Sequence, residues 1–312
     1  MKVLLPDTVA LDPHLPAGTV AVVYDVRRPI PDEHTDAEVL VVWGNPAEPL
    51  ADAAARLKSL RWVQTLAAGP DAVLAAGFGR DVLVTAGLGL HDSTVAEHTL
   101  ALVLAAARRL NLLVRAQIGH RWAGELGGLQ PVREAGSFRT LRDAHVVIWG
   151  FGGIAATLAP LLAALGANVT GVARSAGTRH GFPVVTEDTF PDLLPRTDVL
   201  ISILPATPAT ERVLDAGILA QLQPHAWVVN VGRGATLDEV ALLNAIRSGR
   251  LAGAALDVFD TEPLPPASPL WDEPNIIISP HAAGGRPVGA AELIAENVAA
   301  FQEGRPLRNL IS

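Results

Sequence analysis

A glycine-rich turn near the middle of the chain constrains the fold more than any other feature. The turn, GFGGIA at 150–155, follows the apolar run 145–149 and precedes a stretch rich in alanine and leucine. A strand, a G-x-G-x-x-A turn and a helix in this order direct backbone N–H groups and the positive end of the helix dipole at a pyrophosphate. The pattern predicts a Rossmann domain that binds a dinucleotide through Gly150, Phe151, Gly152, Gly153 and Ile154.

The position of this turn predicts one domain inserted into another. About half of the 312 residues precede it, and a chain of this length exceeds the usual size of a single core. Apolar runs alternate with helix-like segments on both sides of the turn, which is typical of parallel α/β units. We therefore expect an α/β fold with two doubly wound domains. The Rossmann domain spans 94–281, and a substrate domain combines 1–93 with 282–312.

Short apolar runs mark the expected strands, and capping patterns mark the starts of two helices. Buried strands are expected at 2–5, 20–26, 39–43, 62–66 and 82–85, and then at 144–149, 168–173, 199–204, 227–231, 255–259 and 276–279. Capping boxes, TVAE at 94–97 and TLDE at 236–239, predict a long helix to about 118 and a shorter one to 249. Further helices are expected over 47–60 and 288–303. The glycine-rich stretch 119–140 is interpreted as an excursion at an oligomer contact.

Composition argues against several classes of function. The net charge of −8 opposes general binding of nucleic acid, because a polyphosphate would be repelled over most of the surface. The absence of cysteine excludes disulfides, thiol catalysis and cysteine metal sites, and we expect no metal. No apolar run reaches membrane-spanning length, and Pro6 and Asp7 interrupt the first apolar stretch where a signal peptide would continue. We therefore expect a cytoplasmic protein that contacts no membrane.

The strand after the glycine-rich turn indicates which dinucleotide binds. A site for NAD presents a carboxylate to the ribose 2′-hydroxyl about twenty residues after the turn, whereas this strand ends in Ala173-Arg174-Ser175. NADP carries a phosphate at that hydroxyl, which a carboxylate would repel and a guanidinium would bind through paired hydrogen bonds. We expect Arg174 and Ser175 to contact this phosphate, with Thr178 and Arg179 as helpers. The expected cofactor is NADP, with NADPH preferred and NAD left open.

Three charged side chains follow successive expected strands in the second domain. Arg233 lies in NVGRG at 230–234, Glu262 in DVFDTEPLP at 257–265, and His281 in SPHAAG at 279–284. Because ligands bind at the carboxyl ends of parallel strands, the three residues are predicted to meet in one crevice. Arg233 is suited to polarise a ketone, and His281 is suited to donate a proton as hydride arrives at carbon. Glu262 would favour the charged form of the imidazole.

Over nearly its whole length, the chain resembles the D-isomer-specific 2-hydroxyacid dehydrogenases. The motifs that carry the resemblance are LAAGPD at 66–71, VAE at 95–97, the glycine-rich turn, ILPATPAT at 203–210, and the loops of Arg233, Glu262 and His281. The resemblance implies a flavodoxin-like substrate domain, a Rossmann domain, and a homodimer built mainly on the latter. It also implies that Arg233, Glu262 and His281 are the catalytic residues, in the roles given above.

The resemblance implies further contacts with substrate and cofactor. Backbone N–H groups of Ala68 and Gly69 would hold the substrate carboxylate, although Pro70 departs from the aliphatic residue that is usual beside them. Asp257 would bind the nicotinamide carboxamide, and other cofactor contacts would come from Pro205, Thr207, Val231 and Gly232. Trp43 is a candidate wall of the substrate pocket, although a buried packing role is commoner for tryptophan.

The segment Ala173-Arg174-Ser175 is similar to the branch of the family that reduces glyoxylate and hydroxypyruvate with NADPH. We therefore expect NADPH-dependent reduction of a small 2-keto acid to the D-2-hydroxy acid. An NAD-dependent D-3-phosphoglycerate dehydrogenase is the alternative among enzymes, although a phosphorylated substrate would require more basic residues. A dinucleotide-sensing corepressor is the alternative among binding proteins, and it would be expected to carry peptide-binding or disordered extensions.

Overall fold

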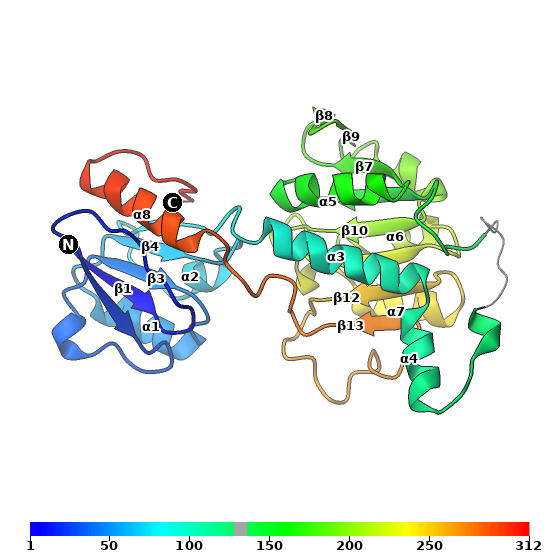
Figure 1. The fold of residues 1–312 in the computed structure, drawn as a ribbon, viewed down its shortest axis with the longest axis horizontal. Helices are drawn as coiled ribbons and strands as arrows, with labels where there is room; N and C mark the ends of the chain where they lie inside the picture. Colours follow the sequence, from blue (N-terminus) through cyan, green and yellow to red (C-terminus); the bar gives the residue numbers. More distant parts are fainter. Residues whose placement is uncertain (128–135, 312) are drawn as a thin grey trace. The chain divides into compact units, whose positions relative to one another are not determined.

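The computed structural model describes residues 1–127 and 136–311. The chain divides into two compact units, one made of Met1–His91 with Arg286–Ser312 and the other of Asp92–Gly285. The second unit is therefore inserted in the first, and in Figure 1 the blue and red ends of the chain lie in the same unit. Each unit is built around its own sheet.

The first unit contains a five-stranded parallel sheet in the order β2-β1-β3-β4-β5. Its strands are β1 (Lys2–Pro6), β2 (Val20–Tyr24), β3 (Val39–Val42), β4 (Trp62–Thr65) and β5 (Leu83–Thr85). The chain order reverses between β1 and β3, which is the switch point of a flavodoxin-like sheet. The expected flavodoxin-like fold of this unit is confirmed.

Helices cover both faces of this sheet. On one face, α1 (Ala47–Arg56) and the short α2 (Asp71–Ala75) pack in a cluster with Leu4 and Leu40. On the other, α8 (Ala290–Gln302) packs in a cluster with Val3 and Val41. Neighbouring residues of β1 and β3 thus face opposite layers, as the two-residue period of a strand requires. Burial of each large aliphatic side chain in these layers contributes roughly 1.5–3 kcal/mol.

A buried polar network fixes α8 and the segment after it to the sheet. Asn297 Nδ2 donates to Gln64 Oε1 at 2.9 Å, and the Asn297 amide also exchanges hydrogen bonds with the backbone of Arg308. Thr85 Oγ1 donates to Gln64 Oε1 at 2.8 Å and accepts from Trp62 Nε1 at 2.7 Å. Each of these three residues, Asn297, Gln64 and Thr85, is at most 1 % exposed. An amide left unpaired here would cost about 1–3 kcal/mol.

The second unit contains an eight-stranded sheet in the order β13-β12-β11-β10-β6-β7-β9-β8. Its strands are β6 (His145–Trp149), β7 (Asn168–Val172), β8 (Gly177–Arg179), β9 (Phe182–Val185), β10 (Val199–Ser202), β11 (Trp227–Asn230), β12 (Gly253–Leu256) and β13 (Ile276–Ile278). β8 is antiparallel to β9, and the other described strand pairs are parallel. The order reverses between β6 and β10, where a Rossmann domain binds its dinucleotide. The expected fold class, α/β with two doubly wound domains, is confirmed.

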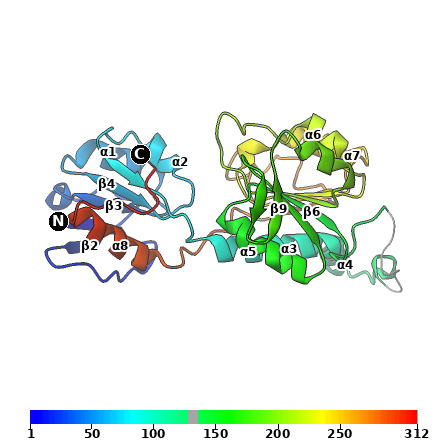
Figure 2. The same cartoon turned by 90° about the horizontal axis from the view of Figure 1, so that it is seen from above.

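Helices also cover both faces of the second sheet (Figure 2). On one face, α3 (Asp92–Ala107) and α5 (Gly153–Ala164) pack in a cluster with Val146 and Ile148 of β6. On the other, α6 (Ala216–Gln221) and α7 (Glu239–Arg247) pack in a cluster with Val147 and Trp149 of the same strand. Within residues 1–127 and 136–311, no helix is both long and apolar enough to span a membrane. Short 3₁₀ helices occur at Asp32–His34, Gly124–Leu126, Phe190–Arg196 and Gly234–Thr236.

The second unit begins with two helices where the sequence predicted one. The predicted capping box at 94–97 is wrong, because α3 begins at Asp92 and Glu97 lies inside it, exposed. The predicted continuous helix to 118 is also wrong. α3 ends at Ala107, and α4 (Leu110–Ile118) begins after Arg109, which has φ 53°. A residue in the left-handed region cannot continue a right-handed helix, so the chain turns at Arg109.

Three other expectations differ from the structure. α7 begins at Glu239 with Asp238 as its N-cap, whose carboxylate accepts from Ala241 N at 2.9 Å, so the predicted cap at 236 is wrong. The strand predicted at 255–259 lies earlier, at 253–256, because the chain leaves the sheet at Asp257. The strand predicted as buried at 20–26 is the edge strand β2, where Val20 and Val23 are 59 % and 66 % exposed. The predicted excursion at 119–140 falls partly outside the described residues.

Candidate active site

The glycine-rich turn follows β6 and leads directly into α5. Gly150 has φ +99°, which favours glycine, and a Cβ there would lie 2.8 Å from the backbone oxygen of Ile203. Gly152 is the N-cap of α5, and a Cβ built on it meets no described atom within 4 Å. Gly153 and Ile154 form the first turn of the helix. The space beside Gly152 is therefore open, although a Cβ on Gly153 would overlap the Asp92 carboxylate. At such a helix N-terminus, N–H groups and the helix dipole favour a phosphate.

The β8–β9 hairpin brings Arg179 to the loop that follows β7. Its Nη2 donates to Ser175 O at 3.0 Å and to Ser175 Oγ at 2.7 Å, while Nη1 donates to Phe151 O at 3.3 Å. Arg179 is half-buried, whereas Arg174, Ser175 and Thr178 are exposed. Arg179 thus links the Ser175 loop to the glycine-rich turn. The guanidinium groups of Arg174 and Arg179 and the hydroxyl of Ser175 suit a phosphate dianion.

The loop of Arg233 follows β11 and is shaped by close backbone packing. A Cβ on Gly232 would lie 2.5 Å from Leu204 O, and a Cβ on Gly234 would also overlap backbone atoms. The Asn230 side chain closes the loop, because its Nδ2 donates to Arg233 O and its Oδ1 accepts from Gly232 N, both at 3.1 Å. The Arg233 guanidinium donates to Gly232 O at 2.8 Å. These contacts therefore fix the backbone from which the Arg233 side chain extends.

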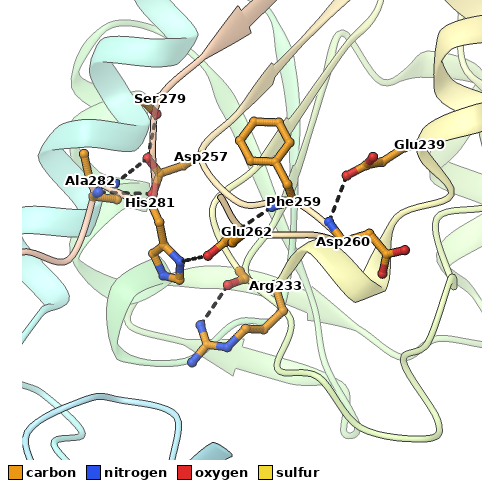
Figure 3. Close-up of polar contacts among 11 residues, drawn as sticks. Arg233, Glu239, Asp257, Phe259, Asp260, Glu262, Ser279, His281 and Ala282 are labelled. Carbon is orange, nitrogen blue, oxygen red and sulfur yellow. Dashed lines mark hydrogen bonds and ion pairs between the residues drawn. The ribbon is translucent and has the colours of Figure 1, made fainter. Parts of the chain in front are cut away.

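His281 and Glu262 form a direct pair after the neighbouring strands β13 and β12. His281 Nδ1 lies 2.8 Å from Glu262 Oε2, and Glu262 Oε1 accepts from Phe259 N at 3.0 Å. The side chains are 49 % and 35 % exposed, so the pair is open to a ligand. Figure 3 draws the Arg233 side chain next to this pair. The three residues predicted as catalytic thus come together from the ends of β11, β12 and β13.

Asp257, predicted at the nicotinamide carboxamide, is 1 % exposed and is engaged within its own unit. Its Oδ1 accepts from Ser279 Oγ at 2.5 Å and from Ala282 N at 2.9 Å, and its Oδ2 accepts from Ala283 N at 3.1 Å (Figure 3). These bonds organise the loop that carries His281. Contact of Asp257 with the carboxamide stays a prediction.

The loop after β10 carries the predicted cofactor contacts Pro205 and Thr207, both exposed. Thr210 braces this loop, because its hydroxyl donates to Pro205 O at 2.6 Å and accepts from Thr207 N at 2.9 Å. Val231, directly after β11, is 7 % exposed, so only its backbone is suited to a ligand. The cofactor roles of these residues stay predictions.

In the first unit, His91 connects Trp43 to the segment that precedes α2. His91 Nε2 lies 2.8 Å from Leu66 O, and its ring stacks on Trp43 with the centroids 5.2 Å apart. Ala68 and Gly69 are half-buried in this segment, and Trp43 is half-buried as well. The predicted substrate residues of this unit are therefore near one another and partly accessible.

His91 and His98 are ordered polar residues that the sequence patterns missed. His98, on α3, places Nε2 2.9 Å from Ser279 Oγ. Both histidines interact with residues distant in sequence, so no local motif marks them. The sequence offered one indication of a role for them, their closeness to the VAE motif at 95–97. Among the described residues, no group of three or more His, Cys, Asp and Glu is arranged to hold a metal ion.

Known proteins resemble this chain in sequence. Residues 100–283 match the family model of the D-isomer specific 2-hydroxyacid dehydrogenase, NAD binding domain. A glyoxylate/hydroxypyruvate reductase A from Serratia proteamaculans is 35 % identical over 289 residues, which cover 90 % of this chain and 88 % of the relative. The match is therefore not confined to the nucleotide-binding half.

Solved structures resemble the chain over its whole length. A D-isomer specific 2-hydroxyacid dehydrogenase from Xanthobacter autotrophicus, in complex with NADPH and MES, is 30 % identical with a TM-score of 0.80, covering 100 % of this chain and 97 % of that one. An NADPH-dependent glyoxylate/hydroxypyruvate reductase from Sinorhizobium meliloti, in complex with NADP and sulfate, is 26 % identical with a TM-score of 0.82, covering 100 % and 98 %. The resemblance inferred from the motifs is confirmed. This chain belongs to the D-isomer specific 2-hydroxyacid dehydrogenases and is an NAD(P)-dependent oxidoreductase of that family.

Proposed function

We propose that this enzyme reduces a small 2-keto acid, glyoxylate or hydroxypyruvate, to the D-2-hydroxy acid and prefers NADPH. The observation that carries the proposal is the His281–Glu262 pair with Arg233 beside it, at the ends of three neighbouring strands. A proton donor and a cationic carbonyl ligand at this place suit carbonyl reduction. The Serratia and Sinorhizobium relatives, named glyoxylate/hydroxypyruvate reductases, support this choice over a phosphoglycerate dehydrogenase or a corepressor.

The residues around the glycine-rich turn fit NADPH. Open space at Gly152 and the N-terminus of α5 suits the pyrophosphate. Arg174, Ser175 and Arg179 suit the 2′-phosphate, and the complexes of the Xanthobacter and Sinorhizobium relatives hold NADPH and NADP. When bound, NADPH supplies the hydride that reaches the keto carbon. The predicted remaining contacts are Pro205, Thr207, Val231, Gly232 and Asp257.

Arg233 has an electrostatic role in the proposed reaction. Its guanidinium polarises the keto oxygen and stabilises the negative charge that develops there as the carbon is reduced. The planar fork also suits the neighbouring carboxylate of a 2-keto acid, which a single point charge would hold less specifically. The backbone bonds from Asn230 support this role, because they fix the origin of the side chain.

His281 is the proposed proton donor, and Glu262 orients it. With Nδ1 bonded to Glu262, the imidazole presents Nε2 as the site that gives a proton to the keto oxygen, forming the hydroxyl, and takes it back in the reverse direction. Glu262 is itself fixed by Phe259 N, so the ring has a defined direction. Ala68, Gly69 and Trp43 stay the predicted substrate contacts of the first unit.

We also propose a homodimer that uses α4. Leu110, Val114 and Ile118 recur at every fourth position of this helix and are 46 %, 50 % and 74 % exposed. This spacing places them on one helix face, and Trp122, 96 % exposed, follows shortly after. An apolar stripe of this kind on a soluble protein indicates an interaction surface. A second copy of the chain is the proposed occupant.

Steady-state kinetics over a panel of 2-keto acids tests the proposed activity. The panel contains glyoxylate, hydroxypyruvate, pyruvate and phosphohydroxypyruvate, each measured with NADPH and with NADH. We expect the highest kcat/KM with glyoxylate or hydroxypyruvate and NADPH, and only the D-enantiomer of glycerate from hydroxypyruvate. Preference for the phosphorylated acid or for NADH, or no turnover on the panel, would contradict the proposal.

A further inference from the structure

One buried carboxylate holds the loop that carries His281. Asp257 follows β12, and its Oδ1 accepts from Ser279 Oγ and Ala282 N, while its Oδ2 accepts from Ala283 N. Its backbone oxygen also accepts from His281 N at 2.7 Å. Asp257 therefore binds this loop before, at and after the proposed proton donor.

His98 on α3 reaches the same carboxylate through a hydroxyl group. Its Nε2 lies 2.9 Å from Ser279 Oγ and 3.3 Å from Asp257 Oδ1. Ser279 Oγ donates its single proton to Asp257 Oδ1 at 2.5 Å. His98 must then donate its own Nε2 proton to Ser279 Oγ. The hydrogen bonds run in one direction, from the helix to the loop.

The conformation of His281 depends on these hydrogen bonds, because its backbone lies in the left-handed region. Its φ is 50°, and a residue other than glycine in this region is strained by about 1 kcal/mol or more. If the loop relaxed to a more favourable backbone conformation, the imidazole would point elsewhere. A displacement of about 1 Å at a reacting group can lower a rate about a hundredfold.

We infer that His98 is a positioning residue for His281 and acts through Ser279 and Asp257. The inference rests on the proposed function, because it requires His281 to deliver the proton. His98 is 25 % exposed and is bonded to the loop rather than to the Glu262 pair. Its role is to hold the loop in the conformation that directs the imidazole, before substrate binds.

Two substitutions at His98 separate positioning from simple packing. Leucine fills much of the volume without a donor, whereas glutamine returns an N–H donor near the place of Nε2. We expect His98→Leu to lower kcat about tenfold, with the KM for the keto acid unchanged. His98→Gln should recover most of the rate. Glu97→Gln, exposed on the same helix, is the matched control and should keep the wild-type kcat.

Ser279→Ala tests the connection independently and also serves if His98→Leu does not fold. It removes the hydroxyl that links His98 to Asp257, so kcat should again fall about tenfold. Adding His98→Leu to Ser279→Ala should lower kcat little further, because the connection is already broken. The ligand-free protein offers a second readout. The His281 Nδ1 proton bonded to Glu262 should give a downfield NMR resonance that broadens in His98→Leu and persists in His98→Gln.

Three results would overturn the inference. The first is a wild-type kcat in folded His98→Leu or Ser279→Ala. The second is a kcat in folded His98→Gln as low as that in His98→Leu. The third is a double variant, His98→Leu with Ser279→Ala, in which the two decreases in kcat multiply. His281→Ala distinguishes this failure from that of the proposed function. If His281→Ala is inactive while His98→Leu is unimpaired, only the positioning role fails. If His281→Ala keeps full turnover, the proposed mechanism fails first.

Discussion

At the scale of single residues, Arg179 is expected to govern the choice between NADPH and NADH. Its guanidinium is already held by Ser175 and Phe151, so little side-chain freedom is lost when a phosphate binds. We predict that Arg179→Ala raises the KM for NADPH about tenfold, because a charge-assisted hydrogen bond contributes about 1.5–3 kcal/mol. The KM for NADH should stay unchanged. Initial rates with each cofactor at saturating keto acid measure the effect.

Arg196→Ala is the matched control, because it removes one exposed arginine from the same unit at the end of a 3₁₀ helix. It should leave both KM values unchanged, which separates a local contact from a general loss of positive charge. An equal rise of the KM for both cofactors in Arg179→Ala would contradict the assignment, since the phosphate is the difference between them.

At the scale of elements, the exposed face of α4 is expected to form the dimer contact. We predict that Ile118→Asp shifts the protein from dimer to monomer, because a charge buried in an apolar interface is not compensated. Size-exclusion chromatography with light scattering measures the mass directly. Val240→Asp is the control, since Val240 is 71 % exposed on α7, outside the stripe. A monomeric wild-type protein, or a dimer that persists in Ile118→Asp, would contradict the proposal.

Some helices and strands of this chain could be predicted from the sequence, and others could not. The central strands were predictable because each is a continuous apolar run, buried on both faces of a parallel sheet. The β8–β9 hairpin was not, since SAGTRHGF at 175–182 is short and polar and forms strands only by pairing at the sheet edge. The break at Arg109 was equally hidden, because the apolar pattern continues across it and no glycine marks the left-handed position.

The proposed catalytic residues could also be predicted from the sequence, because their positions depend on the strands. Arg233, Glu262 and His281 each follow a strand, so the sheet order brings them together without knowledge of the loops. The burial of Asp257 and its bonds to Ser279 could not be predicted, because they join segments more than twenty residues apart through side chains. Arg179 was expected only as a helper, since the hairpin that positions it was not foreseen.

At the scale of the whole molecule, the final helix completes the core of the first unit. We predict that Asn297→Ala destabilises that unit by about 1–3 kcal/mol, because Gln64 loses a buried donor and the backbone N–H and C=O of Arg308 lose their side-chain partner. Hydrogen exchange measured by mass spectrometry should show faster exchange in β4 and β5. The amides of β6 and β10 in the other unit should keep their protection.

Glu296→Ala is the control for this prediction, because the neighbouring side chain pairs with Arg308 on the surface and is 57 % exposed. Exposed ion pairs contribute little, so exchange in β4 and β5 should remain near that of the wild type. Unchanged protection in Asn297→Ala, or equal loss in both variants, would contradict a specific role for the buried amide.

In the proposed mechanism, the imidazole of His281 delivers the proton during keto-acid reduction. The most direct measurement is the single-turnover rate of NADPH oxidation by glyoxylate, compared between the wild-type protein and His281→Ala with both ligands saturating. Loss of a general acid lowers such a rate by about 10²–10⁴-fold, and we predict a loss in this range with little change in the Kd for NADPH. A rate in His281→Ala equal to that of the wild type would show that His281 does not deliver the proton.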